Sequence, residues 1–255
     1  MEQTERRTRL IKYLLEERNE SIGIPSDEGS QKRLLRALLN VRPPMPVSAE
    51  FLSLQDEYLT ERRNERGVTD VKNLAYTDGI SLLKGDITTL NADAIVNAAN
   101  SAMLGCFHPL HNCIDNAIHT FAGVQVRLDC NDIMNGREAE NGEVVVTKAY
   151  NLPSRFIFHT VGPVVCGRVT KENEADLAKC YRNCLSKADE MKLHSIAFCC
   201  ISTGVFGYPK EEAAQFAVKV VQQYKKQTAS SLKIIFDVFT ENDYELYRRI
   251  LGKNR

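Results

Sequence analysis

From Ile80 onward, the chain alternates short apolar runs of strand length with longer stretches whose apolar residues recur at helical spacing. The expected strands are Ile80–Lys84, Ala94–Asn97, Val144–Tyr150, Arg155–Thr160, Ser195–Cys200 and Lys233–Phe239. The expected helices are Cys113–Arg127, Glu174–Met191, Lys210–Gln227 and Asn242–Leu251. This alternation predicts an α/β fold whose mainly parallel or mixed sheet is covered by helices on both faces. Because ligands collect at the carboxyl ends of strands in such sheets, the loops after the strands are the first candidates for a binding site.

The first part of the chain, residues 1–70, has a purely helical pattern. Its apolar residues at helical spacing are Leu10, Ile11, Leu14, Leu15, Leu34, Leu35, Leu38 and Leu39. Prolines at 43, 44 and 46 interrupt this pattern, Ser48 is placed to cap a new helix, and Glu61–Gly67 reads as a charged, solvated stretch. We expect a helical N-terminal extension packed on a main domain of residues 71–255, with a separate partner-binding module as the alternative.

Charge and cysteine usage narrow the class of protein. Lys plus Arg and Asp plus Glu both number 33, and this balance argues against a broad basic surface for nucleic acid. It still permits a nucleotide, which needs only a local anion site. No apolar run reaches the roughly 20 residues of a membrane span, and Met1–Asn19 lacks the apolar core of a secretory signal, so we expect a cytoplasmic protein. In that compartment the eight cysteines stay reduced, and close Cys/His spacings are candidate metal ligands.

Two of the loops that follow strands carry polar groups suited to a nucleoside. Gly85 and Asp86 follow the first strand, where a glycine lets a ligand approach and a carboxylate accepts hydrogen bonds, for example from an adenine amino group. Asn97 and Asn100 end the second strand, and their amides both donate to and accept from sugar hydroxyls. The alternative for each loop is a plain turn built on Asp or Asn side chains.

A third loop, Ile201–Pro209, joins an apolar strand to a helix and is rich in glycine and hydroxyl groups. Exposed backbone N–H groups near the start of a helix hold a diphosphate well. No Gly-Lys-Ser/Thr follows, so it is not a Walker loop. Phe206 and Tyr208 are candidates to wall a ribose or a base, and a simple strand-to-helix turn is the alternative.

A fourth loop places Cys106, His111 and Cys113 within eight residues, directly before a helix. Zinc prefers thiolate and imidazole ligands, and a catalytic site offers three of them and leaves one position open. His108 is a competing ligand. The alternative is an incidental Cys/His loop, and most of the remaining cysteines read as core thiols.

In this order and at these spacings, the loops resemble the macrodomain family over residues 78–250. The motifs are Lys84–Thr88, Asp93–Asn100, Ile114–His119, His159–Pro163 and Ser202–Pro209. Most macrodomains that hydrolyse ADP-ribose have a glycine run before the acid-containing helix, where this chain has Gly105–Cys113. That segment resembles the zinc-dependent branch of protein ADP-ribose hydrolases, which also has a helical N-terminal extension. The resemblance implies a three-layer α/β/α macrodomain with a mixed central sheet.

The resemblance also implies roles for individual residues. Asp86 would hold the adenine by its side chain and Ile87 by its backbone, while Asn100 would contact the distal ribose. Cys106, His111 and Cys113 fall on the zinc-binding positions of the branch. The diphosphate and the distal ribose would be wrapped, mostly through backbone N–H groups, by Ser202, Thr203, Gly204, Val205, Phe206, Gly207 and Tyr208.

The implied activity is zinc-dependent hydrolysis of mono-ADP-ribose from modified protein side chains, with an ester to Asp or Glu as the linkage. Asp115 would orient or deprotonate the attacking water, and Asn100 would fix the ribose. His119, one helical turn from Asp115, is interpreted as a core histidine, with a role beside Asp115 as the alternative, and His159 is assigned to packing. The implied partners are ADP-ribose, an ADP-ribosylated protein such as a lipoyl-carrier protein, and a sirtuin-like transferase. The alternatives are a non-catalytic ADP-ribose reader, a structural zinc module and an RNA binder, the last disfavoured by the neutral charge.

Overall fold

A computed structural model describes residues 1–253 and contains a six-stranded sheet in the order β1-β6-β5-β2-β4-β3. The strands are β1 (Ile80–Lys84), β2 (Ala94–Ala99), β3 (Val144–Lys148), β4 (Phe156–Val161), β5 (Ser195–Phe198) and β6 (Lys233–Val238). Every neighbouring pair is parallel except β3 with β4, so the sheet is mixed. The carboxyl ends of five strands therefore lie at one edge of the sheet.

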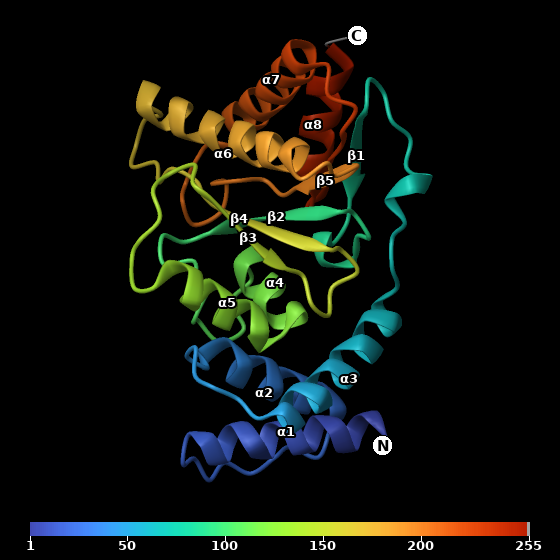
Figure 1. Cartoon of the computed structure of the whole chain (residues 1–255), viewed down its shortest axis with the longest axis vertical. Helices are drawn as coiled ribbons and strands as arrows, with labels where there is room; N and C mark the ends of the chain where they lie inside the picture. Colours follow the sequence, from blue (N-terminus) through green and yellow to red (C-terminus); the bar gives the residue numbers. More distant parts are fainter. Residues whose placement is uncertain (254–255) are drawn as a thin grey trace.

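Helices form the remaining layers (Figure 1). They are α1 (Gln3–Glu17), α2 (Glu28–Val41), α3 (Ala49–Arg66), α4 (Ile114–Ala122), α5 (Val124–Met134), α6 (Lys171–Glu190), α7 (Lys210–Thr228) and α8 (Glu241–Lys253), with short 3-10 helices η1 (Val71–Asn73) and η2 (Ile87–Thr89). Helices α6, α7 and α8 cover one face of the sheet, and α4 and α5 cover the other. The predicted three-layer α/β/α arrangement is confirmed, and α1–α3 lie beyond α4 and α5 as a further tier.

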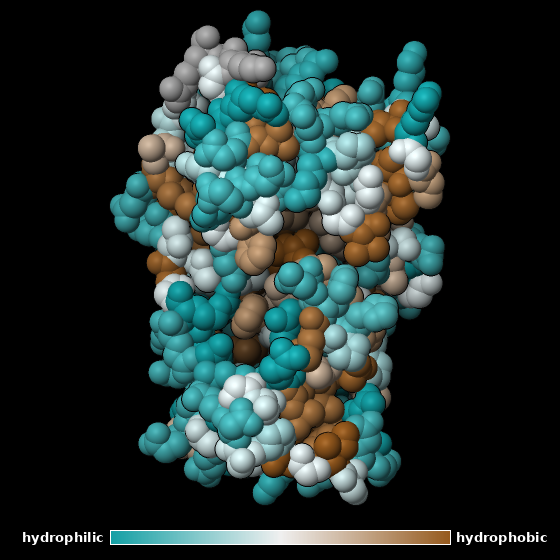
Figure 2. All heavy atoms as spheres, turned by 180° about the vertical axis from the view of Figure 1, so that it is seen from behind, coloured by the Kyte–Doolittle hydropathy of each residue, from teal (hydrophilic) through white to brown (hydrophobic). Residues whose placement is uncertain are grey.

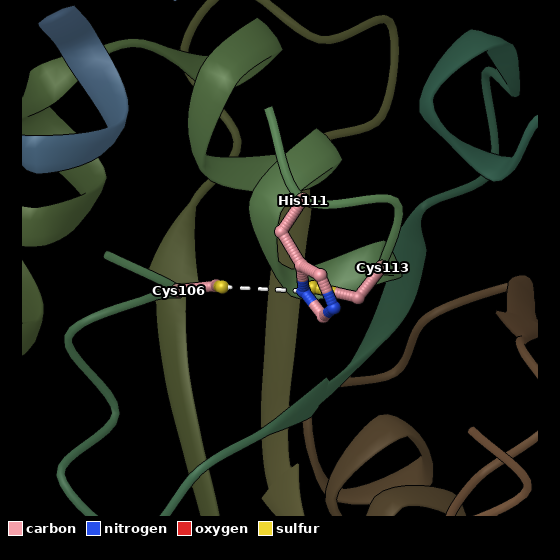
Figure 3. A group of neighbouring side chains, drawn as sticks. All are labelled: Cys106, His111 and Cys113. Carbon is pink, nitrogen blue, oxygen red and sulfur yellow. Dashed lines mark hydrogen bonds between the residues drawn. The ribbon is translucent and has the colours of Figure 1, made fainter. Parts of the chain in front are cut away.

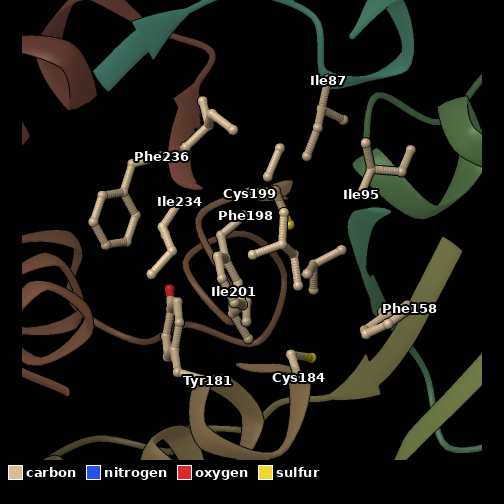
Figure 4. Close-up of a cluster of buried hydrophobic side chains, with 14 of the residues drawn as sticks. Ile87, Ile95, Phe158, Tyr181, Cys184, Phe198, Cys199, Ile201, Ile234 and Phe236 are labelled. Atoms are coloured by element: carbon tan, nitrogen blue, oxygen red, sulfur yellow. The ribbon is translucent and has the colours of Figure 1, made fainter. Parts of the chain in front are cut away.

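The main core lies between the sheet and its helices (Figure 4). Apolar side chains of β5 and β6, such as Phe198 and Phe236, pack there with Tyr181 of α6, and all three are at most 1 % exposed. This burial on both faces explains why the strands read as nearly continuous apolar runs. On the face seen in Figure 2 the surface is largely hydrophilic, with hydrophobic residues gathered around a hollow at mid-height. None of the helices among residues 1–253 is both long and apolar enough to cross a membrane.

The N-terminal helices have an apolar core of their own, built from α1, α2 and α3 and completed by Val124 of α5. Ser48 caps α3 as predicted, because its hydroxyl accepts a hydrogen bond from the backbone N–H of Phe51 at 3.1 Å. Gln55 of α3 accepts a hydrogen bond from the N–H of Val124 at 3.0 Å. The extension is thus packed on the α4–α5 side of the sheet.

One predicted helix is wrong. The expected single helix over Cys113–Arg127 is two helices, because Gly123 adopts a φ of 104° between them. A side chain at Gly123 would meet the amide groups of Gln55 and Gln125 within 2.7 Å, so this glycine allows α3 to approach closely. The expected charged, solvated stretch Glu61–Gly67 has no buried residue, and it forms the last turns of α3 and its glycine cap.

Candidate active site

The loops predicted to bind a ligand all follow strands at one edge of the sheet. Asp86 follows β1, Asn100 follows β2, and the segment Ser202–Tyr208 follows β5. The loop with Cys106, His111 and Cys113 runs from the end of β2 into α4. Segments more than 100 residues apart in the chain are brought to this edge because β1, β2 and β5 run in the same direction.

The three predicted metal ligands lie together and point toward one another (Figure 3). Their ligand atoms all lie within 4.8 Å of one another, and Sγ of Cys106 is 3.4 Å from Nδ1 of His111. Cys113 is also the N-cap of α4, where its sulfur accepts a hydrogen bond from the N–H of Asn116 at 3.4 Å. The imidazole of His108 is not a member of this cluster and its residue is exposed.

This donor set fits zinc. Ideal Zn–S and Zn–N bonds of about 2.3 Å and 2.0 Å in a tetrahedral arrangement put sulfur and nitrogen roughly 3.5 Å apart, close to the Cys106–His111 separation. Two sulfurs and one imidazole occupy three positions and leave the fourth open, as in catalytic zinc sites. Burial raises the pKa of the Cys113 thiol to about 12, so a bound cation would be needed to keep it a thiolate at neutral pH.

Asp115 lies in the first turn of α4, two residues after the candidate ligand Cys113, and is 5 % exposed. Its Oδ1 accepts a hydrogen bond from Nδ2 of Asn97 at 2.8 Å, and its Oδ2 accepts one from Nδ2 of Asn100 at 3.4 Å. Burial raises the pKa of this carboxyl to about 6 despite the Asn97 hydrogen bond. A carboxyl group with such a pKa is suited to accept a proton near neutral pH.

Two buried histidines lie behind Asp115. Nε2 of His119 is 3.5 Å from Oδ1 of Asp115, but the pair lacks hydrogen-bond alignment, and burial lowers the pKa of His119 well below its usual value. Nδ1 of His159 is 3.1 Å from the amide of Asn97, and burial lowers the pKa of His159 to about 3. Both rings are therefore neutral, and neither forms a charged pair with Asp115.

Asn100 connects Asp115 to Gly105–Cys113, the segment with the candidate metal ligands, which we call the metal loop. Its single amide group donates to the carbonyl of Gly105 at 3.1 Å as well as to Asp115. Gly105 has a φ of 81°, and a side chain there would lie 2.7 Å from the ring of His119. The backbone before Cys106 therefore passes so close to α4 that only glycine fits.

The other end of the candidate site contains an ion pair that the sequence did not predict. Arg66, the last residue of α3, donates to Oδ2 of Asp86 at 2.7 Å and also to the hydroxyl of Thr88. Its guanidinium carbon lies 3.7 Å from the centre of the Phe121 ring. Asp86 itself caps η2 by accepting from the N–H of Thr88 at 3.0 Å. The extension thus reaches the residue expected to bind adenine.

A second acid, also absent from the sequence prediction, lies beside Asp86. Asp237 is in β6, is 5 % exposed, and its Oδ1 has no hydrogen-bond partner among residues 1–253. Burial, and to a lesser degree the charge of Asp86, raises the pKa of Asp237 to about 8. At neutral pH this carboxyl is therefore mostly protonated. The sequence signal for Asp237 is its position as an acid inside an apolar strand.

The loop after β5 is a tight turn with an open tip. Ser202 has a φ of 63° and its carbonyl accepts a hydrogen bond from the N–H of Tyr208 at 3.0 Å, while the N–H of Gly207 donates to Gly204 at 3.0 Å. Within residues 1–253 the N–H groups of Gly204, Val205 and Phe206 donate no hydrogen bond to the protein.

The side chains of this loop differ in exposure. Val205 is 78 % exposed, and Thr203 binds the carbonyl of Cys200 through its hydroxyl. Tyr208 is only 2 % exposed, whereas Phe206 is half-buried and packs against a small cluster that includes Met103 and Val161. Free tip amides beside two glycines are suited to an anion such as a diphosphate.

Known proteins resemble this chain along its whole length. The model of the macro domain family matches residues 96–217. A protein-ADP-ribose hydrolase of Treponema medium is 49 % identical over 261 residues, which cover 99 % of this chain and 100 % of that protein. A probable bifunctional ADP-ribose hydrolase/ADP-ribosyltransferase of Fusarium oxysporum f. sp. cubense is 40 % identical over 89 % of this chain and 42 % of its own length.

Solved structures agree with these similarities. The crystal structure of a Trypanosoma brucei macrodomain in complex with ADP-ribose has a TM-score of 0.66 and 31 % identity, over 85 % of this chain and 95 % of that one. The match to the Treponema medium protein includes the helical extension as well as the sheet. The chain therefore belongs to the macro domain family and, within it, resembles full-length relatives that are protein-ADP-ribose hydrolases.

Proposed function

We propose that this protein is a zinc-dependent hydrolase that removes mono-ADP-ribose from modified protein side chains, with an ester to Asp or Glu as the linkage. The observation that carries the proposal is the Cys106–His111–Cys113 cluster directly before the helix that holds Asp115. The similarity to protein-ADP-ribose hydrolases supports the reaction class.

We propose that ADP-ribose lies along the carboxyl edge of the sheet. Asp86 and the backbone of Ile87 hold the adenine, and the tip of the loop from Ser202 to Tyr208 binds the diphosphate through its N–H groups. The distal ribose then lies near Asn100 and the metal cluster. Cys106, His111 and Cys113 would hold zinc there, and the ion would supply Lewis acidity toward an oxygen of the substrate or of water.

Asp115 is the proposed general base. Asn97 donates to its Oδ1 at 2.8 Å, whereas Oδ2 accepts only a longer bond of 3.4 Å from Asn100, so Oδ2 is the oxygen that would orient a water molecule and accept its proton. The water oxygen adds to the anomeric carbon of the distal ribose. The bond from this carbon to the carboxyl oxygen of the modified side chain breaks, and the bonding electrons leave with that oxygen as a carboxylate. The neutral rings of His119 and His159 pack behind the carboxyl and take no proton in this scheme.

The test compares pairs of variants from the same segment. His111→Ala should lose zinc and activity, whereas His108→Ala, which removes an imidazole outside the cluster, should keep about one zinc per chain as measured by elemental analysis. Asp115→Asn should reduce turnover of an ADP-ribosylated protein at least 100-fold, in the range of a lost general base, while Asp132→Asn should not. Full zinc content in His111→Ala would refute the ligand assignment. Binding of ADP-ribose without turnover by the parent protein would instead favour the reader.

The proposal extends to organisation and partners. We propose that residues 1–70 are the helical extension and residues 71–255 the macrodomain. An ADP-ribosylated protein, with a lipoyl-carrier protein as a candidate, is the proposed substrate. Because the Fusarium relative combines hydrolase and ADP-ribosyltransferase names in one protein, we propose a sirtuin-like transferase as functional partner. Free thiols at all eight cysteines fit a reducing compartment, so we propose a cytoplasmic location.

A further inference from the structure

Helix α2 of the N-terminal extension contacts the metal loop through hydrogen bonds. Arg36 of α2 donates from Nη2 to the backbone carbonyl of His111 at 3.2 Å. The same guanidinium donates to Oδ1 of Asn116, from Nη2 at 2.7 Å and from Nε at 3.2 Å. One side chain therefore binds a metal-ligand residue and the helix that follows the loop, across 75 and 80 residues of sequence.

Asn116 connects Arg36 to the first half of the loop, at Cys106 and His108. It is fully buried, and its Nδ2 donates to the carbonyl of His108 at 3.0 Å and is 3.5 Å from the carbonyl of Cys106. Both ends of the amide are thus in use, with Arg36 on the oxygen and the loop backbone on the nitrogen. The amide orients the backbone of Cys106 while Arg36 orients that of His111.

Asn40, one helical turn further along α2, holds the middle of the loop. Its Oδ1 accepts from the N–H of Leu110 at 3.0 Å, and its Nδ2 donates to the hydroxyl of Thr120 in α4 at 2.9 Å. Leu110 has a φ of 58°, a left-handed conformation that costs a non-glycine residue about 1–2 kcal/mol. Asn40 is 1 % exposed, so this bond is shielded from water and helps to keep Leu110 in that conformation.

We propose that α2 is a built-in part of the metal site, in which Arg36 and Asn40 are positioning residues that preorganise Cys106 and His111. The inference rests on the proposed metal site. None of the contacts described for Arg36 and Asn40 involves a ligand atom, so both act through the loop backbone. Partners of this kind orient metal ligands, and their removal typically lowers metal affinity 10- to 100-fold.

If Arg36 acted only through its charge, its removal would change zinc affinity in the opposite direction from the one a positioning role predicts, so the test is decisive. A guanidinium near a divalent cation repels it, so a purely electrostatic role would make Arg36→Met bind zinc more tightly. A positioning role makes the same variant bind zinc more weakly. The matched control is Arg33→Met, which removes an exposed arginine from the same helix.

The experiment measures the zinc dissociation constant of each full-length variant by chelator competition, and ADP-ribose binding of the metal-free proteins by calorimetry. Arg36→Met should raise the zinc dissociation constant at least 10-fold and leave ADP-ribose binding within about twofold of the parent. Arg33→Met should change neither. An unchanged or lowered zinc dissociation constant in Arg36→Met overturns the inference.

Two further measurements keep the test interpretable. If circular dichroism shows that Arg36→Met does not fold, Arg36→Lys decides, because it keeps the charge but cannot span both acceptors. Its zinc dissociation constant should then lie between those of the parent and a ligand variant, and parental affinity overturns the inference. If the parent itself binds no zinc, the proposed function fails first, which separates the two failures.

Discussion

Replacing Asp237 by Asn should stabilise the folded protein increasingly as the pH rises. Asp237 is buried in β6 beside Asp86, and its pKa is raised to about 8. In the unfolded chain the same carboxyl ionises near pH 3.9. The folded state therefore keeps a proton that the unfolded state has lost, and folding becomes less favourable as the pH rises between these two values. An amide at this position does not titrate and removes that dependence.

The size of the effect follows from the slope of this linkage. One proton bound only by the folded state costs about 1.4 kcal/mol of stability per pH unit. Between pH 5 and pH 7 the parent should therefore lose about 2.7 kcal/mol relative to Asp237→Asn. Above about pH 8 both states of the parent are ionised, and the difference between the two proteins should level off.

Urea denaturation of both proteins at pH 5, 6 and 7 measures this difference. Every other titrating group, including Cys106, His111 and Cys113, is present in both proteins, so their contributions cancel. A stability difference that stays constant across these pH values would refute the reasoning, because it would mean that Asp237 ionises normally in the folded state.

Two further predictions concern the loops. Gly105→Ala should destabilise the protein by at least about 1–2 kcal/mol in urea denaturation, because the new methyl group meets the His119 ring at a positive φ. Gly204→Ala, which has no neighbour within 4 Å, should change stability little, and equal stability of the two variants would contradict the first prediction. Asp86→Ala should weaken ADP-ribose binding about 10-fold or more by calorimetry, the value of one hydrogen bond to a charged group. Asp70→Ala, which likewise uncaps a 3-10 helix, is its control, and equal losses would show that Asp86 acts only as a cap.

The sheet and the loops after its strands were predictable because their signal is local. Buried parallel strands leave short apolar runs, and a Cys/His segment in front of a helix is visible as a spacing. The break at Gly123 was missed because the apolar spacing continues through it, from Ile118 to Val126. Only the close approach of α3 shows why a glycine stands there.

The contacts made by the extension were not predictable in the same way. Arg36 and Arg66 look like ordinary surface residues of amphipathic helices, and nothing nearby in sequence marks their partners. Their roles arise from contacts with His111, Asn116 and Asp86, which lie 20 to 80 residues away. Such contacts are properties of the tertiary structure, so periodicity and motif spacing carry no trace of them.

The shared core of α1, α2 and α3 has a mechanical consequence. Arg36 on α2 binds the loop that carries the candidate metal ligands, and Arg66 on α3 binds Asp86, the candidate adenine ligand. Because both helices pack in the same apolar cluster, the two contacts are made by one packed unit of the chain. A tilt of α1–α3 would move the Arg36 contact with His111 and the Arg66 contact with Asp86 together, so the two ends of the proposed ADP-ribose site are coupled through a part of the chain outside the sheet.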